Sequence, residues 1–188
     1  MLKDIFKEGI WITSYATDLN SYVETHLKKD PVGRNVSNNG GYQSMDLDLT
    51  DSSISPLVTY IEKQAFAYGK KLDYHVKKYN MTNMWINVNG YKDYNEQHIH
   101  PYCIFAGVYY INVTPEQGEL CLTRHDIYQK ELSFANFEKL NPYNWSNYEI
   151  KPNNHMCVLF PANLPHSVRP NLTNEKRVSL SFNIQGTV

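Results

Sequence analysis

Residues 177–184 read RVSLSFNI, an alternation of polar and apolar side chains. A period of two predicts a β-strand, because successive side chains of a strand point to opposite faces of the sheet. The polar face is formed by Arg177, Ser179, Ser181 and Asn183. A polar face that carries Arg and Asn rather than Lys and Glu favours a strand that lines a polar cavity over one that faces water.

Residues 84–91 show the same alternation. One face carries Trp85, Asn87, Asn89 and Tyr91, and the other carries Met84, Ile86 and Val88. Two strands of this kind in a small protein predict a β domain that encloses a polar cavity.

The rest of the chain predicts a mainly β domain with supporting helices (α+β). Further strands are expected at 10–12, 42–49, 104–113, 119–123 and 156–160. A short helix is expected after Asp18, a good capping residue, and a longer one from Ser55-Pro56 to about Lys78. We expect one domain over 1–188, with N-terminal strands and helices at 1–80 and a β core at 83–188 that includes a loop at 130–153.

The composition excludes several classes of function. The formal net charge of −1 gives no electrostatic basis for binding nucleic acid, and the apolar runs are too short to span a bilayer. The first residues lack the basic and apolar segments of a signal peptide. Three cysteines, Cys103, Cys121 and Cys157, are widely separated and indicate reduced thiols in a cytoplasmic protein. The oligomeric state is left open.

Residues 98–100 read His-Ile-His. In an extended chain, His98 and His100 lie on the same side and can reach one cation, while Ile99 is expected to turn into the core. Unrelated surface histidines are the alternative interpretation.

A third histidine, His166, follows an apolar strand and a turn with Pro161 and Pro165 at its ends. Proline restricts the backbone, so this turn can fix a ligand at little further entropic cost. A solvated loop histidine is the alternative interpretation.

Arg177 and Ser179 follow His166 on one strand face. An arginine that faces into a barrel requires an anionic partner, because an unpaired buried charge is very costly. A dicarboxylate would accept a two-pronged hydrogen bond from Arg177 and another from the Ser179 hydroxyl. A salt bridge at the rim is the alternative.

The order of a His-x-His pair, a distal His and then Arg-x-Ser resembles the iron(II)/2-oxoglutarate dioxygenase superfamily. The stretches 85–89, 98–101, 107–111, 160–168 and 177–183 resemble the 2OG-Fe(II) oxygenases of bacteria and phages, and the resemblance extends over nearly the whole chain. In the branch of the superfamily that repairs alkylated bases, an Asn-x-Tyr pair precedes the first ligand histidine by the same interval that separates Asn87 from His98.

The resemblance implies a double-stranded β-helix, a jelly-roll or cupin-like barrel. It implies that His98 and His166 bind iron(II), that Arg177 and Ser179 hold 2-oxoglutarate, and that further side chains line the cosubstrate pocket. These lining residues are Asn87, Asn89 and Tyr110. The reaction implied is hydroxylation of a C–H bond with release of succinate and carbon dioxide.

This sequence departs from the superfamily at His100, where Asp or Glu is usual. Three interpretations are open: His100 is the third metal ligand, His100 lies next to a two-histidine site, or Glu119 supplies the carboxylate.

Three functions therefore compete. The first is the oxygenase, acting on a small molecule or a protein side chain. The second is a cupin-type metal protein that does not use 2-oxoglutarate, although the cupin glutamate is missing after His100 and Arg177 then has no role. The third is a non-catalytic jelly-roll binding module, such as a phage virion-associated protein. The aromatic loop at 130–153, which includes Phe134 and Trp145, is predicted to cover the site, to bind a partner or to pack on the barrel.

Overall fold

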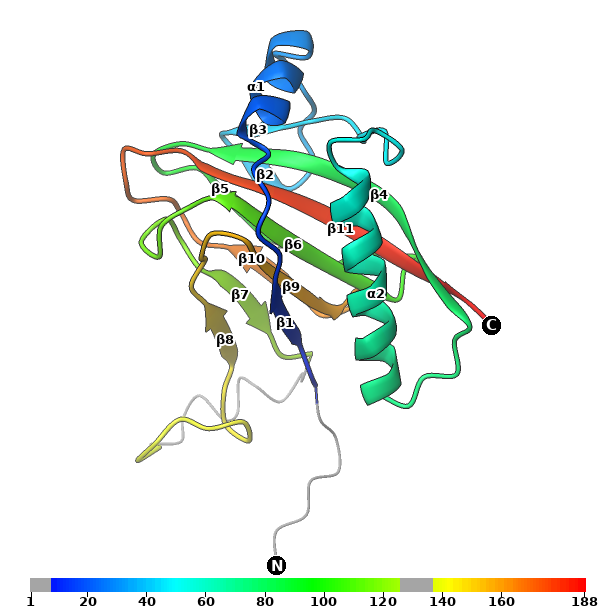
Figure 1. Cartoon of the computed structure of the whole chain (residues 1–188). Helices are drawn as coiled ribbons and strands as arrows, with labels where there is room; N and C mark the ends of the chain where they lie inside the picture. The colour runs from blue at the N-terminus through cyan, green and yellow to red at the C-terminus, as the bar shows by residue number, and fades with distance from the viewer. Residues whose placement is uncertain (1–7, 126–136) are drawn as a thin grey trace, which may run out of the picture.

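The computed structural model describes residues 8–125 and 137–188. Figure 1 shows the elements, which follow in chain order: β1 (Trp11–Ser14), α1 (Asn20–Lys29), β2 (Asn38–Asn39), β3 (Tyr42–Gln43), α2 (Ser55–Lys71), β4 (Lys78–Asn89), β5 (Tyr94–His98), β6 (Phe105–Asn112), β7 (Leu120–Thr123), β8 (Asn147–Ile150), β9 (Met156–Pro161), β10 (His166–Val168) and β11 (Arg177–Thr187).

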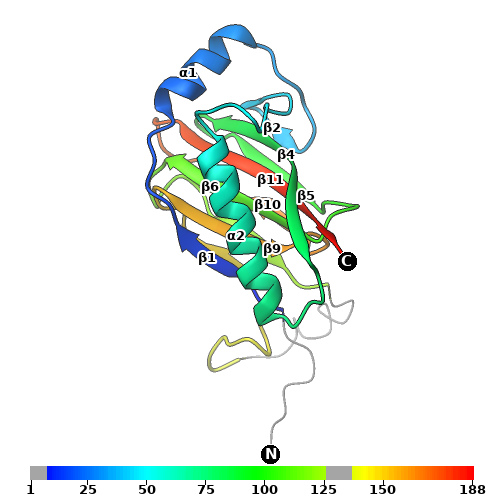
Figure 2. The same cartoon turned by 45° about the vertical axis from the view of Figure 1, so that its right-hand side comes forward.

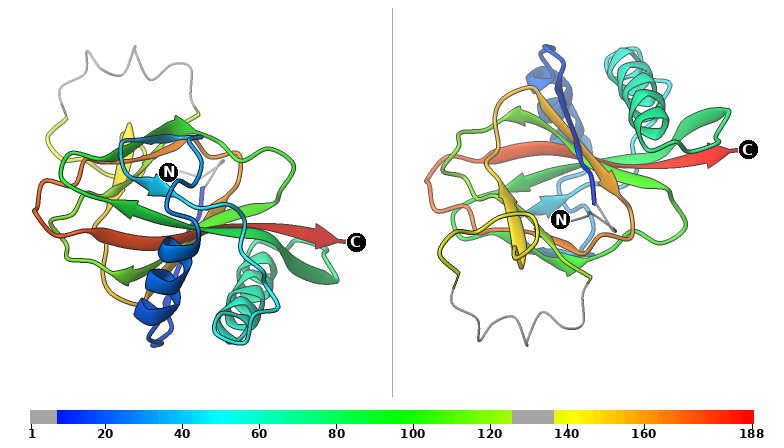
Figure 3. Two further views of the ribbon diagram at one scale, coloured as in Figure 1. Left: turned by 90° about the horizontal axis from the view of Figure 1, so that it is seen from above. Right: turned by 90° about the horizontal axis from the view of Figure 1, so that it is seen from below.

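The described strands form two antiparallel sheets. The larger has the order β1-β9-β6-β11-β4-β3, and the smaller β2-β5-β10-β7-β8. Figure 3 shows both helices on one side of β11 and the strands of the smaller sheet on the other. The predicted mainly β fold, a double-stranded β-helix with supporting helices, is confirmed.

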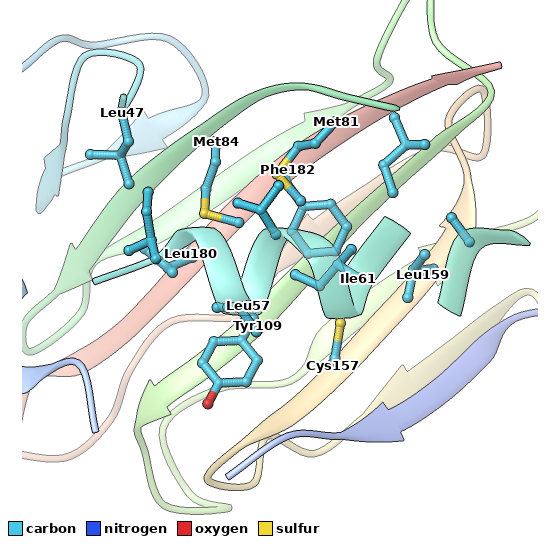
Figure 4. Packing of buried hydrophobic residues seen from close by; sticks show 14 of the residues in the cluster. Leu47, Leu57, Ile61, Met81, Met84, Tyr109, Cys157, Leu159, Leu180 and Phe182 are labelled. Carbon is cyan, nitrogen blue, oxygen red and sulfur yellow. The ribbon is translucent and has the colours of Figure 1, made fainter. Parts of the chain in front are cut away.

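The alternation in β11 sorts its side chains between two environments. Leu180, Phe182 and Ile184 are fully buried in a cluster that includes Leu57 and Ile61 of α2. Figure 4 shows this packing beneath α2, and Figure 2 shows the helix running across the sheet. The opposite face of the sheet meets the smaller sheet, where a second apolar cluster includes Val158, Phe160 and Leu164.

Helix α2 begins at Ser55 with a proline in its first turn, as predicted, but it ends at Lys71 rather than near Lys78. The left-handed backbone of Asp73 (φ 55°) ends the helix, and the Tyr74 N–H donates to the Gly69 carbonyl. The chain then enters β4 at Lys78, earlier than the period of two at 84–91 indicated.

Two other segments differ from the sequence-based expectation. The predicted strand at 42–49 is reduced to the two residues of β3. The predicted loop at 130–153 contains β8, which pairs with β7 and extends the smaller sheet. The rings of Trp145 and Tyr148 are 4.9 Å apart, whereas Phe134 and the rest of 126–136 lie outside the described residues.

The segment from Arg34 to Gln43 joins the two sheets at one edge. Strand β2 pairs with β5 of the smaller sheet, and β3 pairs with β4 of the larger one. Gly40 and Gly41 between them have positive φ values of 69° and 66°, a conformation that glycine adopts without strain.

Across the described residues, no helix combines the length and the apolar character needed to cross a membrane. The three cysteines are unpaired thiols.

Candidate metal centre and cosubstrate pocket

A cavity between the two sheets brings together the three histidines, Arg177, Ser179 and the other residues predicted to line the cosubstrate pocket. Its lining comprises Ser37, Trp85, Asn87, Asn89, Asn95, His98, His100, Gly107, Val108, Tyr110, Leu120, Phe160, His166, Val168, Arg177, Ser179 and Ser181. The histidines lie near Ser181 of β11, because Ser181 is opposite Trp85 and Trp85 stacks on His100, and Arg177 lies four residues away at the start of the same strand.

The pairing of β5 with β10 places His98 beside His166. The two residues are directly opposite each other in the antiparallel register, and their ring centroids are 4.3 Å apart. The turn that precedes His166 therefore places this distal histidine next to the His-Ile-His segment.

His100 reaches the same point from the loop after β5. Its ring stacks on His166 with an interplanar angle of 8°, and the two Nε2 atoms are 3.1 Å apart. The chain leaves the strand after His98, so Ile99 is 49% exposed and does not turn into the core, contrary to the prediction. Trp85 also stacks on His100, with ring centroids 5.8 Å apart.

Hydrogen bonds orient two of the three imidazoles. His98 Nδ1–H donates to the Glu96 carbonyl (2.7 Å), and His166 Nδ1–H donates to the Leu164 carbonyl (2.9 Å). Each Nε2 is thus left with a free lone pair directed at the cluster. The potential ligand atoms of the three histidines all lie within 4.8 Å of one another, a spacing that one cation can bridge.

Burial keeps the histidines neutral. It lowers the pKa of His166 to about 3 and that of His100 to about 4, and the neighbouring His98 adds to both effects. Burial also lowers the pKa of His98. Neutral imidazole is the form that binds a metal, so the cluster is prepared for one at neutral pH.

Arg177, 1% exposed, is held by backbone carbonyls at the opposite end of the cavity. Its Nη1 donates to the carbonyls of Gln117 (2.6 Å), Gly118 (3.3 Å) and Arg169 (3.2 Å). Its Nη2 is buried and has no hydrogen-bond partner in the described part of the chain. A charged donor in this state indicates a site for an anion.

Strand register places the predicted cosubstrate residues around Arg177. Arg177 is opposite Asn89, and Ser179 is opposite both Asn87 and Tyr110. Burial raises the pKa of Tyr110 to about 12, so its phenol stays protonated and can donate a hydrogen bond. The Asn87 amide donates to the Ser181 hydroxyl (2.9 Å).

Four other residues lie elsewhere than the sequence suggested or line the cavity without having been predicted. Tyr91 does not continue the Trp85 face, because β4 ends at Asn89 and Tyr91 is 56% exposed. Glu119 is not part of the histidine cluster, and no Asp or Glu of the described residues lines the cavity. Ser37 and Asn95 were not predicted, because no motif marks them; the pairing of β2 with β5 brings them to the cavity.

Known proteins share sequence features and the fold of this chain. A family model described as "Putative 2OG-Fe(II) oxygenase" matches residues 83–183. No curated protein matches the chain. Among solved structures, a Pseudomonas putida prolyl-4-hydroxylase is 12% identical with a TM-score of 0.62, over 95% of this chain and 92% of that chain.

Two further structures share the fold. The viral collagen prolyl hydroxylase vCPH from Paramecium Bursaria Chlorella virus-1 is 13% identical with a TM-score of 0.58, over 95% of this chain and 96% of that chain. HygX from Streptomyces hygroscopicus, with nickel and 2-oxoglutarate bound, is 11% identical with a TM-score of 0.60, over 96% of this chain and 84% of that chain.

The double-stranded β-helix and its internal histidine cluster define the class, a jelly-roll protein with a candidate metal centre. Since the family model covers more than half of the chain, the chain belongs to the 2OG-Fe(II) oxygenase family, whose cofactors are iron(II) and 2-oxoglutarate. The resemblance seen in the sequence is confirmed, and the oxygenase is the hypothesis that the match favours over a cupin or a non-catalytic module.

Proposed function

We propose that this oxygenase hydroxylates a C–H bond of a substrate that approaches the histidine end of the cavity. In this proposal His98, His100 and His166 hold iron(II), and Arg177 anchors 2-oxoglutarate. The observation that carries the proposal is the unpaired, buried Nη2 of an arginine that lines the same cavity as three neutral imidazoles.

At the Arg177 end, called the closed end because Arg177 is 1% exposed, the free Nη2 would bind one carboxylate of 2-oxoglutarate. The three carbonyls on Nη1 prevent the guanidinium from turning away. Ser179 and Tyr110 add hydroxyl donors, and Asn89 lines the same end of the cavity. A charge-assisted hydrogen bond in a buried site supplies both affinity and orientation.

At the histidine end, the three Nε2 atoms form the ligand set. His100 is the third ligand in this proposal, because it is in the cluster and Glu119 is not. Three imidazoles suit iron(II) and leave one more positive charge at the metal than two histidines and a carboxylate would.

Iron(II) held by the three histidines would supply the oxidising chemistry: dioxygen and 2-oxoglutarate would be consumed, with one oxygen atom going into the substrate C–H bond, the other into succinate, and carbon dioxide released. The chain itself positions 2-oxoglutarate, and the apolar wall of Val108, Leu120 and Phe160 excludes water from the reacting atoms.

The substrate class that we propose is a small molecule or a protein side chain. Among the similar structures, one is a collagen prolyl hydroxylase and another, HygX, was solved with hygromycin B bound. The net charge of −1 argues against nucleic acid. We place the protein in the cytoplasm, host cytoplasm if it is encoded by a phage, because free cysteines are ordinary there.

The test is anaerobic titration of the purified protein with iron(II) and 2-oxoglutarate. We expect the weak visible charge-transfer band of the iron–2-oxoglutarate chelate, and succinate on admission of oxygen. The matched control is Arg177→Lys, which should bind iron(II) as the parent does and give the band only at higher 2-oxoglutarate. Iron(II) binding with neither band nor succinate would contradict the proposal.

A further inference from the structure

The three histidines differ in how the second ring nitrogen is held. His98 and His166 each donate from Nδ1 to a backbone carbonyl two residues earlier in the chain. In the described part of the chain, no backbone carbonyl accepts a hydrogen bond from the His100 ring, whose Nε2 faces His166. The ring nitrogen that points away from the cluster therefore needs another acceptor.

Asn183 of β11 lies beside this ring. It continues the polar face of the strand two positions beyond Ser181, and Ser181 is opposite Trp85, the residue that stacks on His100. Two positions further along β11, the Gln185 side-chain amide donates to the Tyr102 carbonyl (2.9 Å), so this part of the strand runs beside the loop that carries His100. The Asn183 Oδ1 is buried and has no hydrogen-bond partner within the described residues, so this acceptor is unpaired.

An imidazole that gives Nε2 to a metal carries its proton on Nδ1, and a buried N–H without an acceptor is costly. A carboxylate ligand at this position would carry no such proton. The replacement of Asp or Glu by histidine thus creates a requirement for a nearby acceptor, and the unpaired Oδ1 of Asn183 is available for it.

We propose that Asn183 is a positioning residue whose Oδ1 accepts the Nδ1–H of His100 and holds Nε2 toward the metal. The inference rests on the ligand set given under the proposed function. It assigns a role to Asn183, a residue of β11 that the binding of 2-oxoglutarate by Arg177 does not involve.

The experiment compares three variants in cobalt(II) titrations of the full chain. Asn183→Leu removes the acceptor, and Asn183→Asp keeps one. Asn83→Leu is the matched control, because Asn83 is directly opposite Asn183 in the sheet and its amide contacts Asp46 rather than a histidine. Cobalt(II) affinity should fall by roughly 10- to 100-fold in Asn183→Leu, as for loss of other ligand-orienting groups, and stay within about threefold of the parent in the other two.

A spectroscopic signature separates positioning from general structural damage. In the cobalt(II)-loaded protein, each imidazole bound through Nε2 should give one exchangeable, strongly shifted Nδ1–H proton resonance. The parent should show three, with the His100 resonance assigned by its loss in His100→Ala. Asn183→Leu should lose this resonance alone, through faster exchange with water, and Asn183→Asp should restore it.

The outcomes distinguish this inference from the proposed function. Three resonances in the parent that all persist in Asn183→Leu would overturn the role of Asn183 and leave the ligand set intact. Two resonances in the parent, with none from His100, would also overturn it and leave a two-histidine centre. Failure of the parent to bind cobalt(II) would remove the proposed metal centre itself.

Discussion

The two ends of the cavity are built differently. At the closed end, Arg177, Ser179 and Asn89 project from β11 and β4, two long neighbouring strands in the middle of the larger sheet. At the histidine end, His98 ends a short strand and His100 lies in a loop, and both are partly exposed. In the proposed site, the carboxylate of 2-oxoglutarate would therefore be held from two central strands of the larger sheet, and the metal would lie at the partly exposed end of the cavity.

The largest expected effect is at the histidine end. His166→Ala removes an imidazole that is 3% exposed and oriented by the Leu164 carbonyl. We expect iron(II) affinity to fall by more than about 100-fold, because loss of an outer group that merely orients a ligand already costs roughly 10- to 100-fold. Isothermal titration calorimetry measures this, and 2-oxoglutarate turnover should disappear in parallel. Undiminished metal binding would exclude His166 as a ligand.

Removal of the metal should have the next largest effect, on stability. An ion held by His98 and His166 would connect β5 to β10. At 100 times its dissociation constant, a ligand specific for the folded state contributes about 2.7 kcal/mol. For a chain of this size, that corresponds to about 5 to 10 °C in Tm.

Differential scanning calorimetry with and without a chelator tests this expectation, with His166→Ala as the control that should not respond. An equal shift in both proteins would mean that the metal binds elsewhere.

Arg177→Lys tests the closed end. Lysine keeps the positive charge but lacks the planar fork that holds the backbone carbonyls and a carboxylate at once. We expect 2-oxoglutarate affinity to fall by about tenfold, or about 1.4 kcal/mol, with iron(II) affinity unchanged. Equal losses of both affinities would show that the two ends of the cavity do not act separately.

The smallest expected effect is that of Ser179→Ala. The variant removes one hydroxyl near Arg177 and leaves the strand register intact. The KM for 2-oxoglutarate should rise by about three- to tenfold, which is the net contribution of one hydrogen bond of about 0.5 to 1.5 kcal/mol. The matched variant Ser181→Ala, nearer the histidines, should change this KM less.

Most of the side chains at the Arg177 end of the cavity could be predicted from the sequence, because the alternation of side chains along a strand is regular. The period of two in 177–184 and 84–89 assigns each side chain to a face, and the structure places Arg177, Ser179, Asn87 and Asn89 in one cavity. The carbonyls of Gln117 and Arg169 that hold Arg177 could not be predicted, because any residue type presents a carbonyl.

The histidine end could be predicted only in part. His98 and His166 were selected by spacing and turn chemistry, and their direct pairing comes from the β5–β10 register, which the sequence does not specify. The exposure of Ile99 and the stacking of Trp85 on His100 depend on where β5 ends, a local boundary that tertiary contacts decide.

The position of β11 between β4 and β6 has a consequence for biosynthesis. As the chain leaves the ribosome, β4 and β6 emerge first, but each has to wait for residues 177–187 before its inner edge can pair. Until then both strands present unpaired backbone and apolar side chains to other nascent proteins. The same late segment carries Arg177 and Asn183, so the proposed site is completed in the same step in which β4 and β6 gain their missing partner.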